Sequence, residues 1–279
     1  SDTLLTSAAS VGGGHLYYAS GSWVRRCEYY DGAHVLWEYR IPCGGLFATG
    51  ARTGNVIAAD VGVRTVHTVN TNGARIGLDL MPIVPHALTL LEDDSTATVA
   101  CANSEGELIV KRIGGPQLYG TSMDGDVSQL IASRRGGWFA AGLRNVGVRV
   151  YGLADSIPIA TILPPRLGMS PQLGLANDDL LAVGWTGDSG VVLYSTTSWY
   201  PIDTLLRDVP TPRSFSVSAD GKVIYYMREG VGIVGVDIRS NEPVSIVPLA
   251  STVDAWVEGL ADTVVALFNG KQMRTYGVA

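Results

Sequence analysis

The 279-residue sequence predicts an all-β fold built from repeated antiparallel units. Short strand-like runs recur along the whole chain, they recur at a nearly constant interval, and 34 glycines and 13 prolines are spread among them as turn residues. Each run is rich in β-branched or aromatic residues and is bounded by Gly, Asn or Asp, which is typical of a strand. Helical periodicity is hard to find. The chain therefore reads as a succession of strands and turns.

The interval between equivalent runs indicates an internal repeat. Corresponding residues of successive runs are 40 to 43 residues apart, a period typical of repeat architectures. The runs are HLYYAS (15–20), NVIAAD (55–60), ATVACA (97–102), WFAAGL (138–143), DLLAVGW (179–185), KVIYYM (222–227) and TVVALF (263–268).

Prolines at a second constant phase predict where each unit has its edge. They recur at intervals of 42, 43 and 42 residues, each just before a strand-like run: Pro116, Pro158, Pro201 and Pro243. Proline has no amide donor, so within sheets it is confined to edge strands, strand starts and bulges. We therefore assign the run after each proline to the outermost strand of its unit, and the same phase extended backwards places outer strands near Ala74 and His34.

One unit shows the strand order most clearly. SFSVS (214–218) is its inner strand, KVIYYM the second, GIVGVD (232–237) the third and PVSIVPL (243–249) the outer one, with Ala219-Asp220-Gly221 as the first hairpin turn. Four short strands per repeat of this length predict a seven-bladed β-propeller, a single domain with four antiparallel strands per blade. The expected blades are residues 7–42, 43–84, 85–124, 125–165, 166–208, 209–250, and 251–279 together with 1–6.

The number of strands expected in the last blade predicts how the ring of blades closes. The proline phase would place its outer strand near residue 285, so residues 253–279 supply three strands. The run SDTLL (1–5) resembles the outer-strand run IDTLL (202–206), which predicts that residues 2–5 add as the fourth strand and protect an edge that would otherwise invite aggregation. The alternative is that residues 3–9 form the inner strand of the first blade.

Two blade segments carry a family resemblance. Val148-Arg-Val-Tyr-Gly-Leu153 at the end of a third strand, and Ser218-x-Asp-Gly-Lys222, resemble degenerate blade motifs of the WD40 and YVTN-type repeat families. The resemblance extends over nearly the whole chain and concerns architecture. It implies a propeller, a fold that hosts interaction platforms, lectins and hydrolases, so the activity must be argued from a site.

Composition narrows the function classes. Only 16% of residues are charged and 46% are hydrophobic, which favours a folded core over disorder. A net charge of −6 provides no basic field for nucleic acid or an anionic membrane. No uncharged run approaches the ~20 residues that span a bilayer, so we expect a soluble cytoplasmic protein, although a processed secreted or virion protein would have the same features. Cys27, Cys43 and Cys101 are expected as core residues, with Cys27–Cys43 as the one conceivable disulfide.

Candidate chemical motifs each have a simpler structural interpretation. Gly187-Asp188-Ser189-Gly190 copies the nucleophile segment of chymotrypsin-like proteases, with His34 as the candidate base, but Ser189 falls where the repeat places a hairpin turn. The inner strands carry one charged residue, Glu258, so no catalytic group is predicted to line the central channel. No cofactor and no metal site are predicted, because the acidic turns and the four histidines lack ligand spacing.

We therefore expect a non-enzymatic platform for protein partners, alone or as a component of a larger assembly; a propeller lectin or a hydrolase with a loop-borne site is the alternative. The six tryptophans fall at different phases of the repeat, which favours packing over repeated sugar sites. Long connections at PPRLGMSP (164–171) and RDVPTPR (207–213) predict the partner-binding surface, because loops on a rigid scaffold concentrate binding. Its candidate residues are Arg166, Met169, Trp185, Asp188, Arg207, Asp208, Arg213 and Glu229.

Overall fold

A computed structural model describes most of the chain as antiparallel strands, with no helix among the described residues. The described residues are 5–11, 15–20, 22–28, 34–41, 44–49, 53–92, 96–133, 135–177, 180–210, 215–218, 221–228, 230–248, 255–261, 264–269 and 272–277. Within these ranges, no helix is long and apolar enough to cross a membrane. The predicted all-β class is confirmed.

The described strands form seven sheets, numbered 1 to 7 here in chain order. Their first strands are β1 (Leu5–Val11), β5 (Gly44–Thr49), β9 (Ala87–Glu92), β13 (Val127–Ala132), β17 (Pro171–Asn177), β21 (Phe215–Val217) and β25 (Ala255–Ala261). The second strands are β2 (His15–Ser20), β6 (Val56–Asp60), β10 (Ala97–Ala102), β14 (Trp138–Leu143), β18 (Leu180–Trp185), β22 (Val223–Arg228) and β26 (Val264–Asn269). The third strands are β3 (Trp23–Glu28), β7 (Thr65–Val69), β11 (Glu107–Arg112), β15 (Gly147–Gly152), β19 (Ser189–Ser195), β23 (Gly232–Asp237) and β27 (Gln272–Gly277). Sheets 1 to 6 add a fourth strand: β4 (His34–Arg40), β8 (Arg75–Leu80), β12 (Gln117–Ser122), β16 (Pro158–Ile162), β20 (Pro201–Pro210) and β24 (Pro243–Pro248).

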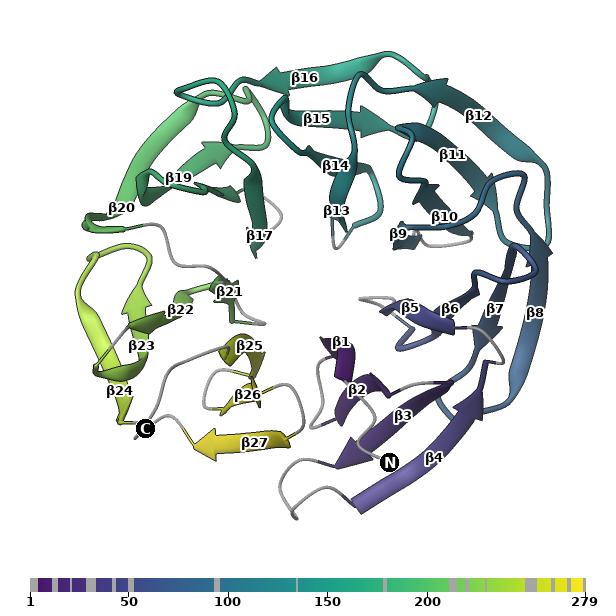
Figure 1. Ribbon diagram of the computed structural model, residues 1–279, viewed down its shortest axis with the longest axis horizontal. Coiled ribbons are helices and arrows are strands. Elements are labelled where there is room, and N and C mark those ends of the chain that lie inside the picture. The colour runs from purple at the N-terminus through teal and green to yellow at the C-terminus, as the bar shows by residue number, and fades with distance from the viewer. Residues whose placement is uncertain are drawn as a thin grey trace.

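Each sheet is an antiparallel meander whose strands pair in chain order. Figure 1 shows the sheets following one another around a common centre, with the first strand of each sheet innermost and the fourth at the rim. Strand β1 contacts β5 of the next sheet and also β25 of the last one, so the first and last sheets lie side by side.

The repeat predicted from the sequence coincides with this strand order. The seven strand-like runs are the second strands of the seven sheets, within one residue at either end. The fourth strands begin at or just after the phased prolines, and β8 and β4 begin where the phase was extended backwards. In the described residues the last sheet has three strands, as expected.

The predicted closing strand is wrong for Leu5. Strand β1 pairs with β2 in sheet 1, where Leu5 lies opposite Ser20 and Val11 opposite His15. Among the described residues the first sheet therefore starts at Leu5, two residues before the expected blade boundary, and the alternative interpretation holds for residues 5–9. A hairpin with the immediately following strand closes a far shorter loop than pairing with the other end of the chain. Residues 1–4 lie outside the described residues.

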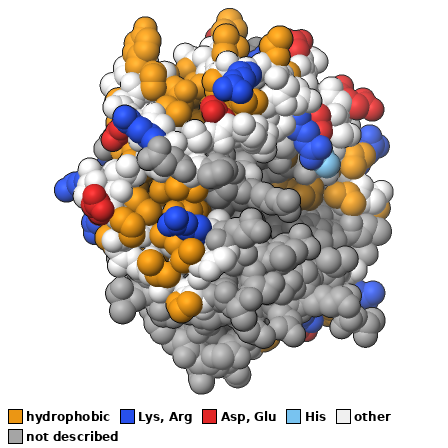
Figure 2. All heavy atoms as spheres, turned by 60° about the vertical axis from the view of Figure 1, so that its left-hand side comes forward, with side chains coloured by type: hydrophobic (Ala, Val, Ile, Leu, Met, Phe, Trp, Pro, Cys, Tyr) orange, Lys and Arg blue, Asp and Glu red, His pale blue; other side chains and the backbone are white. Residues whose placement is uncertain are grey.

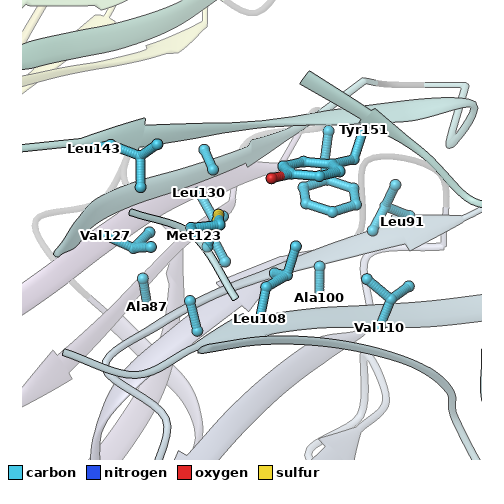
Figure 3. Close-up of a cluster of buried hydrophobic side chains, with 13 residues drawn as sticks. Ala87, Leu91, Ala100, Leu108, Val110, Met123, Val127, Leu130, Leu143 and Tyr151 are labelled. Carbon is cyan, nitrogen blue, oxygen red and sulfur yellow. The ribbon is translucent and has the colours of Figure 1, made fainter. Parts of the chain in front are cut away.

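The core lies between the sheets. Strands β6, β9 and β10 are buried almost throughout, which explains why their sequences are mostly apolar and do not alternate between apolar and polar residues. Figure 3 shows one such cluster between sheets 3 and 4, where Leu108 and Met123 face Leu143 and Tyr151, and Tyr151 stacks on Phe139. Burying each large side chain contributes about 1.5–3 kcal/mol.

Cys101 lies in the neighbouring cluster between sheets 2 and 3. Burial raises the pKa of its thiol to about 12, so it behaves as the small hydrophobe expected from the sequence. The side chains of Cys27 and Cys43 lie outside the described residues.

Buried and half-buried polar side chains join neighbouring sheets. Asp79 on β8 accepts a hydrogen bond from Lys111 Nζ of sheet 3 at 2.8 Å and from the amide of Gly114. The Gln129 side-chain amide on β13 both donates to and accepts from the backbone of Leu173 on β17, at 3.1 and 2.9 Å. These bonds satisfy groups that burial would otherwise leave unpaired, and they fix one sheet against the next.

Candidate partner-binding surface

The connection between sheets 4 and 5, residues 163–170, has a fixed base. Pro164 and Pro165 follow β16 after Leu163, and neither has an amide N–H to continue a strand ladder. Gly168 turns the chain at a φ of +86°, a conformation that favours glycine. Met169 then returns to the core, where it packs in the same buried cluster as Leu173 and Trp185. The loop is thus held by prolines at one end and a buried methionine at the other.

The same loop projects apolar side chains into solvent. Leu167 is 96% exposed and Leu163 is 71% exposed. Arg166, between them, is also exposed and forms no ion pair with any described residue. Exposed apolar side chains with polar neighbours mark interaction sites, and arginine is enriched among the residues that contribute most to binding, so this loop has features of a protein-binding surface.

The loop lies against the hairpin that joins β18 to β19. The Thr186 amide donates to the Ser170 carbonyl at 3.0 Å, and the Ser170 amide donates to Thr186 Oγ1 at 2.9 Å. Elsewhere the Arg144 amide donates to the Asp126 carbonyl in the same way. Connections between sheets and second-to-third hairpins therefore share one face, as predicted. Asp188 in this hairpin is half-buried.

Two of the predicted partner-binding residues belong to the core on which the loop packs. The side chains of Met169 and Trp185 are buried in the core cluster between sheets 4 and 5. Their residue types are common at interfaces, but burial of this kind removes them from the surface available to a partner. The exposed candidates in this part of the molecule are Arg166 and Leu167, of which Leu167 was not singled out from the sequence.

The predicted loop at residues 207–213 is wrong for its first four residues, because β20 continues to Pro210. Ser189 pairs with Pro210 whereas Val191 pairs with Leu205, so residues 206–209 bulge out of the ladder. Arg207 is exposed on this bulge, and its guanidinium contacts the Thr204 carbonyl at 3.1 Å and Asp203 at 3.3 Å. Arg207 therefore remains an exposed candidate, but on a strand bulge.

Three further candidates are described only in part or not at all. Only the backbone of Asp208 is described, within β20. Arg213 and Glu229 lie outside the described residues.

An exposed apolar row along β16 and the residues that flank it was not predicted from the sequence. Ile157 is 67% exposed, Ile159 is 54% exposed, and Leu163 continues the row into the loop. The alternate residues Pro158, Ala160 and Ile162 are apolar too, so alternation could not reveal which face is open to solvent. Figure 2 shows hydrophobic side chains gathered along the top and left of the described surface.

The nucleophile-like motif occupies the hairpin that the repeat predicted. Gly187 and Asp188 form the turn, with Gly187 at a φ of +82°, and Ser189 begins β19 in sheet 5. His34 begins β4 in sheet 1, and β4 and β19 lie on opposite sides of the molecule (Figure 1). The structure does not bring the two residues together.

Two arginines on sheet 4 and its hairpin are paired with carboxylates of the preceding connection. Arg149 Nη2 lies 2.8 Å from the Asp124 carboxylate, and this hydrogen bond raises the pKa of Arg149. Arg144 pairs with Asp126 at 3.2 Å. In the part of the chain that the structure describes, no three His, Cys, Asp or Glu side chains come together as a metal site. The described surface next to the loop therefore offers apolar contact and one unpaired guanidinium.

Comparison of the chain with protein-family models and with curated protein sequences finds no match.

Proposed function

We propose that the chain is a seven-bladed β-propeller of WD40-like architecture, a single closed domain that serves as a non-enzymatic platform for a protein partner. The architecture is supported by the chain-order sheets around one centre and by the contact of β1 with β25. In this architecture, packing between the first and last sheets closes the ring of blades.

The exposure of Leu167 on a fixed loop carries the functional part of the proposal. A leucine that is 96% exposed contributes nothing to the stability of the isolated chain. Buried against a partner it would contribute about 1.5–3 kcal/mol. Because Pro164, Pro165 and Met169 already fix the loop, little conformational entropy is lost on binding.

Aromatic packing favours a protein partner over a sugar. Trp138 and Trp199 pack edge to face, with ring centroids 5.1 Å apart, and Trp185 is buried. Trp37 donates its indole N–H to the Thr71 carbonyl at 2.9 Å. These rings are engaged in packing within the protein, whereas a lectin needs an open ring face for each sugar.

The test is affinity capture from cells of the native host with three immobilised proteins: wild type, Leu167→Asp and Ile246→Asp. Ile246 is a matched control, since it is an exposed apolar residue on β24 in sheet 6. We expect one stoichiometric partner with wild type and the control, and at least tenfold weaker binding by Leu167→Asp. Arg166→Glu should weaken binding in the same direction.

All three variants should melt within a few degrees of wild type, because exposed substitutions usually cost within ~0.5 kcal/mol. Equal capture by wild type and Leu167→Asp would refute the assigned surface. Binding to a glycan array without any protein partner would refute the platform itself.

A further inference from the structure

Strand β16 is an edge strand that leads directly into the 163–170 loop. Among the described strands it pairs with β15 alone, as the last strand of sheet 4. In an antiparallel edge strand, every second residue directs its N–H and C=O away from the sheet. Such an edge can accept an additional strand from another chain.

This edge lacks the charges that normally protect an exposed strand. Residues 156–165 contain no charged side chain. By contrast, β8 carries Arg75 and Asp79, and β20 carries Asp203 and Arg207. Strands β12 and β24 are also uncharged. The large apolar side chains of β12, Leu118 and Tyr119, are partly buried against the core, and β24 has a proline at both ends.

Exposed apolar side chains accompany the free edge. Ile159 lies within β16, and Ile157 and Leu163 flank it. Exposure alternates along residues 157–163, with these three side chains among the exposed positions, so they lie on one face although the ladder shifts register at residue 159. Leu167, on the loop that follows, is exposed as well. A strand added along β16 would therefore place alternate side chains against these residues.

We propose that the free edge of β16 binds an extended segment of the partner as an additional strand, an inference that rests on the proposed function. The segment carries apolar residues at alternate positions, which pack on Ile157, Ile159 and Leu163. It carries an acidic residue where the segment reaches Arg166.

Area and charge both favour a peptide segment over a second copy of this chain. The four exposed side chains offer only a few hundred Å² of apolar surface, well below the ~800 Å² per partner of a standard interface. Main-chain pairing along a five-residue strand adds affinity without needing a wide surface.

Arg166 lacks an ion partner among the described residues, whereas Asp155 at the other end of the strand already accepts a hydrogen bond from the Ile157 amide at 3.0 Å. The partner segment should therefore carry an acidic residue to complement the charge of Arg166.

The experiment is a selection of random twelve-residue peptides displayed on phage against the wild-type protein. Selected peptides are synthesised with a fluorophore, and their affinity is measured by anisotropy for wild type, Ile159→Lys, Ile157→Lys and the control Ile246→Lys. We expect alternating apolar residues with an acidic residue near one end. Affinity should fall at least tenfold in the Ile157 and Ile159 variants and stay unchanged in the control. Circular dichroism confirms that each variant is folded, and two positions, one in β16 and one just before it, are used in case one variant is not.

Backbone methylation of the selected peptide tests strand pairing itself. N-methylation at the alternate residues that face β16 should abolish binding, while methylation at the intervening residues should leave it within about twofold. Equal tolerance of both sets overturns the proposal, as does a selection that yields no peptide sensitive to Ile159→Lys. A wild-type dimer in light scattering that Ile159→Lys converts to monomer would assign the edge to a second copy and also overturn it.

The two proposals fail separately. If the captured partner is lost by Leu167→Asp but retained by Ile159→Lys, the platform stands and the strand-addition site is refuted. If neither variant affects the partner, both are refuted.

Discussion

His67 shows how a single polar side chain depends on two neighbouring sheets. It is 8% exposed on β7, with Nδ1 2.8 Å from the Tyr39 hydroxyl of sheet 1 and Nε2 3.2 Å from Thr65 Oγ1. Burial lowers the pKa of His67, and the positive charge of Arg75 lowers it further, against an opposing effect of Asp60. The imidazole is therefore held in its neutral form between the two sheets.

The free energy of unfolding should consequently fall in mild acid, because His67 becomes protonated. Because the folded pKa lies below the unfolded value of about 6.5, the stabilisation is fully present above that value and is lost as pH falls through the folded pKa. We expect the urea midpoint of wild type to drop from pH 7.5 to 5, and that of His67→Gln to drop less. His86→Gln is the control at an exposed histidine and should follow wild type. A drop in His67→Gln as large as in wild type would contradict this role.

For single residues, the sequence predicted that residues 164–171 form a loop, but it did not predict which side chains of that loop are exposed. The prolines of PPRLGMSP and its place between two strand runs indicate a connection that projects from the sheets. Whether Met169, Trp185 or Leu167 faces solvent depends on packing between sheets 4 and 5, which joins residues from separate repeats. Residue type therefore favoured Met169 and Trp185, and the structure exposes Leu167 instead.

Among the strands, β19 and β20 show how a ladder accommodates extra residues. Gly190 has a φ of +81°, and a Cβ there would lie 2.8 Å from the Leu205 carbonyl oxygen and 3.0 Å from Thr204 Cγ2. Leu206 adopts a φ of +56°, and its amide donates to Asn241 Oδ1 at 3.2 Å. A side-chain acceptor from sheet 6 thus supports the strained bulge.

Gly190→Ala should destabilise the protein more than Gly187→Ala. Both glycines have nearly the same φ, but the space around Gly187 is open. Each alanine incurs the positive-φ penalty of about 1 kcal/mol, and Gly190→Ala adds a steric overlap of about 1–3 kcal/mol. Urea unfolding of the two variants measures the difference. Equal loss of stability in both would mean that the ladder relaxes around residue 190.

The length of β20 could not be predicted either, because it depends on pairing with β19 across the bulge. RDVPTPR contains two prolines and charged residues, which is typical of a loop. Pro210 nevertheless pairs with Ser189 across the bulge, a register decided by the partner strand. The starts of the outer strands were predictable, because proline acts locally on the residue that carries it.

For the whole molecule, buried clusters couple each sheet to the next. The described clusters join sheets 1 and 2, 2 and 3, 3 and 4, 4 and 5, and 5 and 6. In each, side chains from two sheets share one core, so a sheet that unfolds exposes the faces of its neighbours.

The protein should therefore unfold in a single transition, with a far-UV circular dichroism spectrum of β structure and little helix. Ellipticity and tryptophan fluorescence should give the same midpoint, since the tryptophans lie in several sheets. Two separated transitions would show that groups of sheets unfold independently, and a helical spectrum from more than about a tenth of residues would contradict the fold.

At this scale the repeat made the order of strands and sheets predictable, because period and proline phase recur in every unit. The closing strand was not predictable. The likeness of residues 1–5 to residues 202–206 indicates strand propensity in both, but propensity does not specify a partner strand. In the structure Leu5 pairs with the hairpin neighbour β2.

Hydrogen–deuterium exchange of the protein, alone and with its captured partner, locates the partner-binding surface. We expect slower exchange on binding in residues 157–170 and in the adjoining hairpin at 186–188. Exchange should not change in the third-to-fourth hairpins at 70–74, 113–116 and 196–200, which lie at the opposite ends of the strands. Protection of those hairpins with residues 157–170 unchanged would place the partner on the other face and refute the proposed binding surface.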